Sequence, residues 1–183
     1  MTTSVVRTGE GRSSPTERAQ AVIEGVDAIG LDFVLQLPSS TLAAVIRHLE
    51  SRATPRTFPV TREEEAIGIA SGLALAGKKA ALVIQDNGLG NLLTALNTFP
   101  LAYHLPVFMV VSRRGGLNEY NSMIHLFCER VEAIADAAGL RYWKLDGRVP
   151  IDAWASTITK GFEHSVLTRR PVAVFVDLMG GQP

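Results

Sequence analysis

The chain of 183 residues has little of several features that commonly reveal a protein's class. Its one cysteine, Cys128, excludes an internal disulfide and any zinc cluster built on several cysteines, and it favours a reducing compartment such as the cytoplasm. The 18 basic and 18 acidic residues cancel, so no charge excess points to nucleic acid or to an acidic membrane surface. No apolar run approaches the roughly 18 residues of a transmembrane helix. We therefore expect neither nucleic-acid binding nor membrane insertion.

What remains is the composition of one folded domain. Hydrophobic residues make up 46% of the chain and charged residues 20%, which is typical of a globular protein. Residues 1–15 are rich in Ser, Thr, Gly and Arg and lack the apolar core of a secretory signal, so we expect a flexible tail there. Residues 16–183 are expected to form a single domain. A neutral, rather apolar domain also favours association with other chains.

Short apolar runs alternate along the chain with longer stretches of helical character. Several runs are apolar at consecutive positions, which is typical of strands covered on both faces of a parallel sheet. We therefore predict an α/β fold, a three-layer sandwich in which helices flank a mostly parallel six-stranded sheet. The expected strands are 32–37, 56–60, 80–85, 106–112, 140–145 and 171–178, and the expected helices are 16–29, 39–51, 62–76, 88–99, 127–138 and 150–168.

Ligands in such folds bind at the carboxyl ends of the strands, which directs attention to the loops that follow them. One apparent motif lies elsewhere. The segment GLALAGKK (72–79) nearly matches a phosphate-binding loop, but it lacks the final Ser or Thr and ends a helix where the motif should open one. We interpret Gly77 as a helix stop and Lys78 and Lys79 as a solvated turn.

The segment QDNGLGNLL (85–93) follows an expected strand and opens an expected helix. Its G-x-G begins a dinucleotide-binding fingerprint, but Leu93 replaces the third glycine. Two interpretations stay open: a tight turn with positive φ at Gly88 or Gly90, or a backbone that must approach a ligand closely. A non-catalytic nucleotide-binding module built on this loop is therefore a remote alternative function.

The segment TREEEAIGIASG (61–72) places three acids at the start of a helix that then carries no charge until Lys78. Thr61 and Glu64 fit a capping box, and acids suit the positive end of the helix dipole. The apolar remainder predicts a helix that is buried nearly all round. Successive helical residues are about 100° apart, so Glu63 and Glu65 point elsewhere when Glu64 caps, and one of them can enter a site.

Three motifs in this order resemble those of a known family. They are REEE (62–65), IQ-x-x-GLGN (84–91) and RG-x-x-x-E (114–119). Together they resemble the pyrimidine-binding domain of thiamine-diphosphate-dependent 2-oxo-acid decarboxylases, in particular the members that act on sulfopyruvate or phosphonopyruvate. The resemblance covers about residues 30–125, and the family's fold agrees with the predicted sheet.

The resemblance implies a role for one of the three glutamates. In that family a glutamate hydrogen-bonds N1′ of the cofactor's aminopyrimidine ring and so activates thiamine diphosphate, which serves as the electron sink for decarboxylation. The family's glutamate precedes a motif glycine by nine residues, which corresponds to Glu63 when counted from Gly72. Glu63 is therefore the expected catalytic residue and a cofactor contact, with Glu65 as the fallback.

Other positions carry over from the family by their place in the motifs. The implied cofactor contacts, besides Glu63, are Pro38, Gln85, Asn87, Gly88 and Asn91. The implied substrate contacts are Ser39, Ser40, Arg113, Arg114, Glu119 and His125. A sulfonate or phosphonate needs cations or hydrogen-bond donors, which Arg and His supply. The simpler explanations are helix capping for Ser40, turn and cap chemistry for the asparagines, and a solvated polar loop for 113–125.

The second half of the family's site has no counterpart here. Family members hold the cofactor's diphosphate through Mg2+, using a GDG motif and a later Asn in a pyrophosphate-binding domain, and this chain has no GDG. The resemblance thus implies the alpha subunit of a two-component decarboxylase, in a hetero-oligomer of paired alpha and beta chains. Its beta subunit would carry the pyrophosphate-binding domain and hold Mg2+, so we expect no metal ligand in this chain. The expected substrate is a small anionic 2-oxo acid, sulfopyruvate ahead of phosphonopyruvate, and the products are the aldehyde and carbon dioxide.

Overall fold

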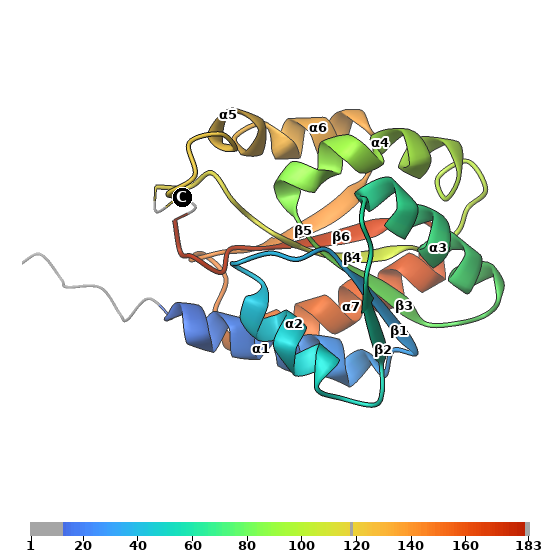
Figure 1. The fold of residues 1–183 in the computed structure, drawn as a ribbon, viewed down its shortest axis with the longest axis horizontal. Coiled ribbons are helices and arrows are strands. Elements are labelled where there is room, and N and C mark those ends of the chain that lie inside the picture. Colours follow the sequence, from blue (N-terminus) through green and yellow to red (C-terminus); the bar gives the residue numbers. More distant parts are fainter. Residues whose placement is uncertain (1–12, 118, 182–183) are drawn as a thin grey trace, which may run out of the picture.

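The fold is a three-layer α/β sandwich, which confirms the predicted class (Figure 1). A computed structural model of the chain describes residues 13–117 and 119–181. One sheet forms the middle layer, with α1, α2 and α7 on one face and α3, α4, α5 and α6 on the other. The tail expected over residues 1–15 lies, for residues 1–12, outside the described part, whereas Ser14 and Pro15 already belong to the start of α1.

All six strands of the sheet run parallel, in the order β2-β1-β3-β4-β6-β5. Every residue of β4 and β6 is buried, as the uninterrupted apolar runs predict. Alternate side chains of β4 enter opposite cores: Phe108 and Val110 face α1 and α7, whereas Met109 and Val111 face α3 and α4. The strands are β1 Phe33–Gln36, β2 Arg56–Pro59, β3 Ala80–Gln85, β4 Phe108–Ser112, β5 Arg141–Leu145 and β6 Val172–Val176.

The helices follow the predicted segments with shifted ends. Helix α1 begins with a complete capping box between Ser14 and Glu17 and ends at Gly30, whose φ of 67° closes the last turn. The short η1 turn, Asp86–Gly88, leads directly into α4. The helices are α1 Pro15–Ile29, α2 Ala43–Glu50, α3 Glu63–Leu75, α4 Leu89–Thr98, α5 His125–Cys128, α6 Val131–Ala137 and α7 Asp152–Thr168. Among the described residues, none of these helices is both long and apolar enough to cross a membrane.

Three of the expected helices differ from their predicted form. Helix α2 begins at Ala43 and not at residue 39, and its N-cap residue Leu42 makes no side-chain cap. Capping is therefore not the role of Ser40. The segment predicted as one helix over 127–138 divides into α5 and α6. Helix α3 is buried on one face only, because Gly68 and Gly72 on its outer face have open space around them.

The chain order of the strands places a topological switch between β1 and β3. From β1 the chain moves outward to β2, and from β3 it moves the opposite way to β4. The loops that follow β1 and β3 therefore diverge at the carboxyl edge of the sheet, the place where ligands of such folds bind. The loop 38–42 after β1, the η1 turn after β3 and the described parts of the loop after β4 (113–117 and 119–124) meet at this edge.

Candidate active site

Helix α3 begins with three adjacent glutamates, and its geometry sends them in three directions. Glu65 turns back to Thr61 and accepts hydrogen bonds from its backbone N–H at 3.1 Å and its hydroxyl at 2.8 Å. Glu64 forms an ion pair with Arg62 Nε at 2.8 Å. The predicted Thr61–Glu64 capping box is therefore wrong. The helix begins at Glu63, one residue later than predicted, and Glu65 accepts the hydrogen bonds from Thr61 that were expected for Glu64.

Glu63 turns inward, toward the loop that opens α4. Its side chain is buried, and its Oε2 accepts a hydrogen bond from Asn91 Nδ2 at 2.9 Å. A Cβ atom on Gly88 would lie 2.7 Å from Glu63 Cδ, closer than real Cβ contacts come. The carboxylate is thus held between α3 and the η1–α4 loop. Glu65 accepts hydrogen bonds from Thr61 and does not enter the space between α3 and this loop.

Gly88 is required here by close packing and not by backbone conformation. Its φ of −73° and ψ of −13° are accessible to any residue. Gly90 lies inside α4, where a Cβ would be 3.1 Å from the Phe127 ring. Neither glycine has a positive φ, so the tight turn, one of the two open interpretations, is excluded. The loop also lacks the open glycine turn of a dinucleotide-binding fingerprint, which weakens the nucleotide-module alternative.

Asn87 carries a buried acceptor at the same loop. Its Oδ1 is shielded from solvent and has no hydrogen-bond partner in the part of the chain that the structure describes. Such an acceptor costs about 1–3 kcal/mol unless a donor reaches it. Pro38 is exposed at the end of β1, on the other side of the β1–β3 switch. The loop beside Glu63 therefore offers an available acceptor and a close-packed glycine.

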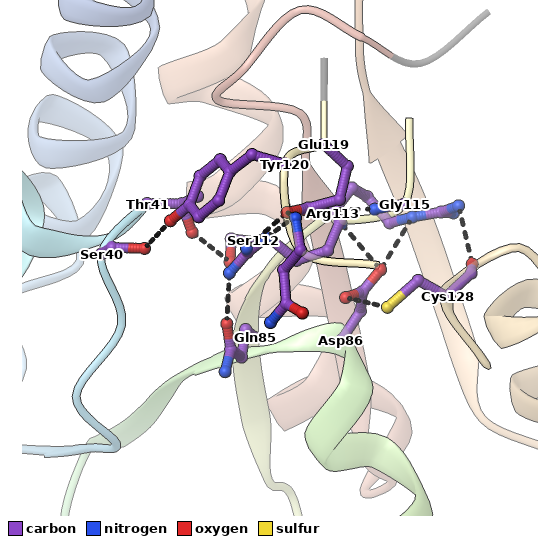
Figure 2. A network of polar contacts seen from close by, with 12 residues as sticks. Ser40, Thr41, Gln85, Asp86, Ser112, Arg113, Gly115, Glu119, Tyr120 and Cys128 are labelled. Carbon is purple, nitrogen blue, oxygen red and sulfur yellow. Dashed lines mark hydrogen bonds and ion pairs between the residues drawn. The ribbon is translucent and has the colours of Figure 1, made fainter. Parts of the chain in front are cut away.

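A second polar cluster, centred on Arg114, lies where β1, β3 and β4 end (Figure 2). Arg114 donates from Nε and Nη2 to the Glu119 carboxylate at 2.5 and 2.8 Å. Its Nη1 donates to Gln85 Oε1 at 2.8 Å, and that oxygen also lies 3.4 Å from the Ser39 hydroxyl, which donates to it. Gln85, implied for the cofactor, thus contacts Ser39 and Arg114, which are implied for the substrate, and Arg114 connects it to Glu119.

The Arg114–Glu119 pair is buried and fully ionised at neutral pH. The hydrogen bonds from Arg114, helped by the Asn121 N–H, lower the pKa of Glu119 to about 2 against the opposing effect of burial. The Glu119 hydrogen bond in turn raises the pKa of Arg114. Because the two charges neutralise one another, the cluster presents a fixed, polar wall.

Two hydroxyl contacts join the loop after β1 to β4 and its following loop. The Ser40 and Tyr120 hydroxyls are 2.9 Å apart, and those of Thr41 and Ser112 are 3.1 Å apart. The Tyr120 ring also lies against the Arg114 guanidinium, 5.6 Å from its carbon to the ring centre. The Ser40 hydroxyl therefore links the loop after β1 to the loop after β4.

Asp86 connects three segments beneath this wall. Its Oδ2 accepts a hydrogen bond from the Arg114 backbone N–H at 3.0 Å and lies 3.2 Å from Arg113 Nε. Its Oδ1 accepts from the Cys128 thiol at 3.2 Å. Burial raises the pKa of Asp86, although these partners offset part of the rise. Burial likewise raises the pKa of the Cys128 thiol, which makes it a poor nucleophile.

The two remaining predicted substrate residues, Arg113 and His125, make other contacts. Arg113 donates to Glu132 Oε1 at 2.6 Å and lies on the Cys128 side of the network, away from Ser40 (Figure 2). His125 Nε2 lies 3.3 Å from the Glu119 carbonyl oxygen. The structure therefore does not bring Arg113 into the group formed by Ser39, Gln85, Arg114 and Glu119.

Sequence reasoning missed several members of the network. Ser112 is the first polar residue at the end of the apolar strand β4, and Asp86 directly follows Gln85 at the end of β3, positions that mark both as candidates. Thr41 is the third hydroxyl in a row after Pro38, and Tyr120 directly follows Glu119 of the third motif. Nothing in the sequence pattern indicated that the buried thiol of Cys128 would contact Asp86.

The fold and this edge of the sheet define a ligand-binding α/β domain with a buried glutamate at its switch point. Residues 16–124 match the family described as "Thiamine pyrophosphate enzyme, N-terminal TPP binding domain". The chain belongs to this family, so the resemblance carried by the three motifs is confirmed.

Curated relatives share this ancestry over most of the chain. The sulfopyruvate decarboxylase subunit alpha of Methanococcus maripaludis is 30% identical over 161 residues, covering 88% of this chain and 95% of that protein. The subunit alpha of Methanothermobacter thermautotrophicus is 32% identical, covering 88% of this chain and 96% of that protein. The phosphonopyruvate decarboxylase of Streptomyces viridochromogenes is 27% identical, covering 62% of this chain and 28% of that protein.

A solved structure shares the fold. It is a 2-oxoglutarate:ferredoxin oxidoreductase from Magnetococcus marinus, matched with a TM-score of 0.66 over 90% of this chain and 29% of that chain. At 17% sequence identity this likeness concerns the fold alone.

Proposed function

We propose that the chain is the pyrimidine-binding alpha subunit of a two-component thiamine-diphosphate-dependent decarboxylase. It would convert a 3-substituted pyruvate, sulfopyruvate in the first place, into the aldehyde and carbon dioxide. Homologues covered over nearly their whole length bear the name sulfopyruvate decarboxylase subunit alpha. With one buried cysteine and no described membrane-spanning helix, the cytoplasm is the compartment we assign.

The observation that carries this proposal is the placement of Glu63. Its carboxylate is buried, is oriented by Asn91, and is wedged against Gly88 at the carboxyl edge of the sheet. A carboxylate fixed in this way can hold or share a proton with a ring nitrogen at Oε1, because Asn91 engages only Oε2. Glu63 is therefore the residue to which we assign the activation of the cofactor.

The surrounding loop fits the aminopyrimidine end of thiamine diphosphate. Asn87 Oδ1, which has no hydrogen-bond partner among residues 13–117 and 119–181, would accept a hydrogen bond from a ligand donor, and Gly88 lets the backbone of this loop lie close to Glu63. Gln85 and Asn91 bound the same loop, and Pro38 bounds the site from the side of β1. When bound, the cofactor supplies a nucleophilic carbon and an electron sink for decarboxylation.

A second subunit completes the site in this proposal. A longer relative, the sulfopyruvate decarboxylase of Methanosarcina acetivorans, is 30% identical over 80% of this chain, which spans 37% of it. That protein joins a counterpart of this chain to further sequence. The outer face of α3 supports a covering partner, because Gly68 and Gly72 are open and Leu75 is 66% exposed on a helix that begins with Glu63. We assign the diphosphate and Mg2+ to the beta subunit of the resulting hetero-oligomer.

The loop after β4 sets the substrate side of the site. The Arg114–Glu119 pair is internally neutralised, so we assign it, with Ser39, to shaping the wall and polarising Gln85. Hydroxyl donors at Ser40 and Tyr120, together with His125, are then the groups available to a small anionic 2-oxo acid. Arg113 forms an ion pair with Asp86, which in turn accepts a hydrogen bond from the Arg114 backbone and so holds this loop in place.

The test is reconstitution. The purified chain alone should release no carbon dioxide from sulfopyruvate, and adding a beta chain, thiamine diphosphate and Mg2+ should restore turnover. Equal turnover without the beta chain would contradict the two-component assignment. In the reconstituted enzyme, competition between sulfopyruvate and phosphonopyruvate identifies the preferred substrate. A higher kcat/KM for phosphonopyruvate would make phosphonopyruvate the assigned substrate.

A further inference from the structure

A cavity of about 720 Å³ lies at the amino edge of the sheet, opposite to Glu63. It opens between the end of α3, the turn that leads into β3, and the last turns of α7. The stretch of α3 from Glu63 to Ala74 spans roughly 16 Å, so the cavity is a separate site. Its volume falls within the range of roughly 300–1,000 Å³ that is common for small-molecule sites.

The interior of the cavity is apolar. Its floor includes Ala70 and Phe108, both buried, and Phe108 meets Phe162 edge to face with ring centres 5.7 Å apart. Val166 and Leu167 form part of the mouth and are 49% and 83% exposed. Apolar side chains are therefore continuous from the buried floor to the surface, as a ligand with an apolar body requires.

The rim of the cavity is positively charged. Three of the chain's four lysines, Lys78, Lys79 and Lys160, line it, with Glu163 as the acidic residue among the lining side chains. Within residues 13–117 and 119–181 no carboxylate forms an ion pair with these three ammonium groups, whereas Lys144, outside the cavity, pairs with Glu132 at 2.8 Å. The solvated turn predicted for Lys78 and Lys79 is thus one wall of a cavity.

We propose that this cavity binds an amphipathic organic anion, a small molecule with an unbranched or aromatic apolar body and a carboxylate head. The body would occupy the space between Ala70, Phe108 and Phe162. The head would remain at the mouth, where lysine ammonium groups on flexible stems can reach it while their methylenes cover apolar surface. The excess of lysines over Glu163 selects an anion over a cation of the same shape.

Calorimetric titration of the full chain with sodium decanoate, below its micelle concentration, tests this proposal. We expect one site per chain with a Kd of about 100 µM, given the usual affinity per heavy atom. Octanoate should bind about tenfold more weakly because two methylenes are lost. Decyltrimethylammonium, a cation with the same chain, should give no binding at these concentrations.

Variants locate the site. The Lys79→Gln/Lys160→Gln variant should bind decanoate about tenfold more weakly, because it loses two charge contacts at the rim. Ala74→Phe, at a half-buried lining position, should abolish binding by filling the cavity. Lys144→Gln removes the one lysine outside the cavity and should leave the affinity unchanged. Equal affinities for the anion and the cation, or for the wild type and the Lys79/Lys160 variant, would overturn the proposal.

Lysine acetylation followed by mass spectrometry supplies an independent readout. Decanoate should protect Lys79 and Lys160 from acetylation in the full chain and leave Lys144 unaffected. Protection of Lys79 and Lys160 in an assembled oligomer without any added anion would show that a protein surface covers the groove, and this too would overturn the proposal. The outcome does not depend on decarboxylase activity.

Discussion

The contact between Gly88 and Glu63 gives the sharpest test of the site's geometry. Gly88 has helical φ and ψ, so alanine can adopt the same backbone conformation without strain. The added methyl would come closest to Glu63 Oε1 and would lie 2.7 Å from Glu63 Cδ and 2.8 Å from its Cγ. Gly88→Ala is therefore a steric perturbation aimed at a single carboxylate.

The size of the effect follows from this distance. Ordinary contacts of a Cβ are 3.4–4 Å, so the Glu63 carboxylate must move by about 1 Å or the η1 turn must shift. Overpacking of this kind costs about 1–3 kcal/mol of unfolding free energy. A displacement of about 1 Å at a reacting group lowers kcat by about 100-fold.

The assay combines urea unfolding of the chain with decarboxylation by the reconstituted enzyme. Gly72→Ala is the matched control for stability, because its Cβ would meet no atom within 4 Å and alanine favours a helix by about 1 kcal/mol. We expect Gly72→Ala to stabilise the isolated chain and Gly88→Ala to destabilise it and to lower kcat. Wild-type stability and kcat in Gly88→Ala would refute the close approach of Gly88 to Glu63.

Three further predictions concern the network around Arg114 and Asp86. The pKa of Glu119 is lowered to about 2, so its stabilising effect is present above the unfolded pKa near 4.5 and is lost as the pH falls toward 2. Glu119→Gln should thus lower the free energy of unfolding by roughly 2 kcal/mol at pH 6. Urea unfolding should show a smaller difference between the variant and the wild type at pH 3, and a difference independent of pH would contradict the ion pair. The Cys128 thiol is buried with a raised pKa, so a disulfide exchange reagent should label it only after unfolding in guanidinium; labelling of the folded chain would contradict its burial against Asp86. Ser40→Ala and Tyr120→Phe should each raise KM a few-fold. A double-mutant cycle on KM should give a coupling energy of about 0.5–1 kcal/mol between the two hydroxyls. Strictly additive effects would show that the two hydroxyls do not interact.

The sequence was sufficient to predict the fold because each buried strand is an uninterrupted apolar run. The runs at 80–85 and 172–176 correspond to β3 and β6, which are covered by helices on both faces. The helix ends were less predictable, since several polar residues compete for the same cap. Thr61 had two candidate partners one residue apart, and the choice of Glu65 over Glu64 depends on where the first helical turn begins.

The candidate site was predictable where its residues lie in contiguous motifs and not where distant segments meet. Helix geometry alone does not decide whether Glu63 or Glu65 enters the site. In the structure Glu63 is buried, whereas Glu65 accepts a hydrogen bond from the Thr61 hydroxyl. The contact of Asp86 with Cys128 joins residues 42 positions apart, and no spacing rule reports such a pair. The prediction that α3 is buried nearly all round is wrong for this chain for a related reason. An apolar helix sequence indicates burial but not whether the same chain or a partner covers it.

Glu63 is the residue that we propose activates a cofactor shared with a second subunit. The most direct measurement is kcat for sulfopyruvate in enzyme reconstituted with Glu63→Gln, beside Glu65→Gln as the control on the same turn. Glutamine can still accept the hydrogen bond from Asn91 and keep the fold, but it cannot hold the proton. We predict assembly like the wild type with kcat lowered by about 100-fold or more for Glu63→Gln, and nearly normal kcat for Glu65→Gln. Normal kinetics in Glu63→Gln would contradict the account.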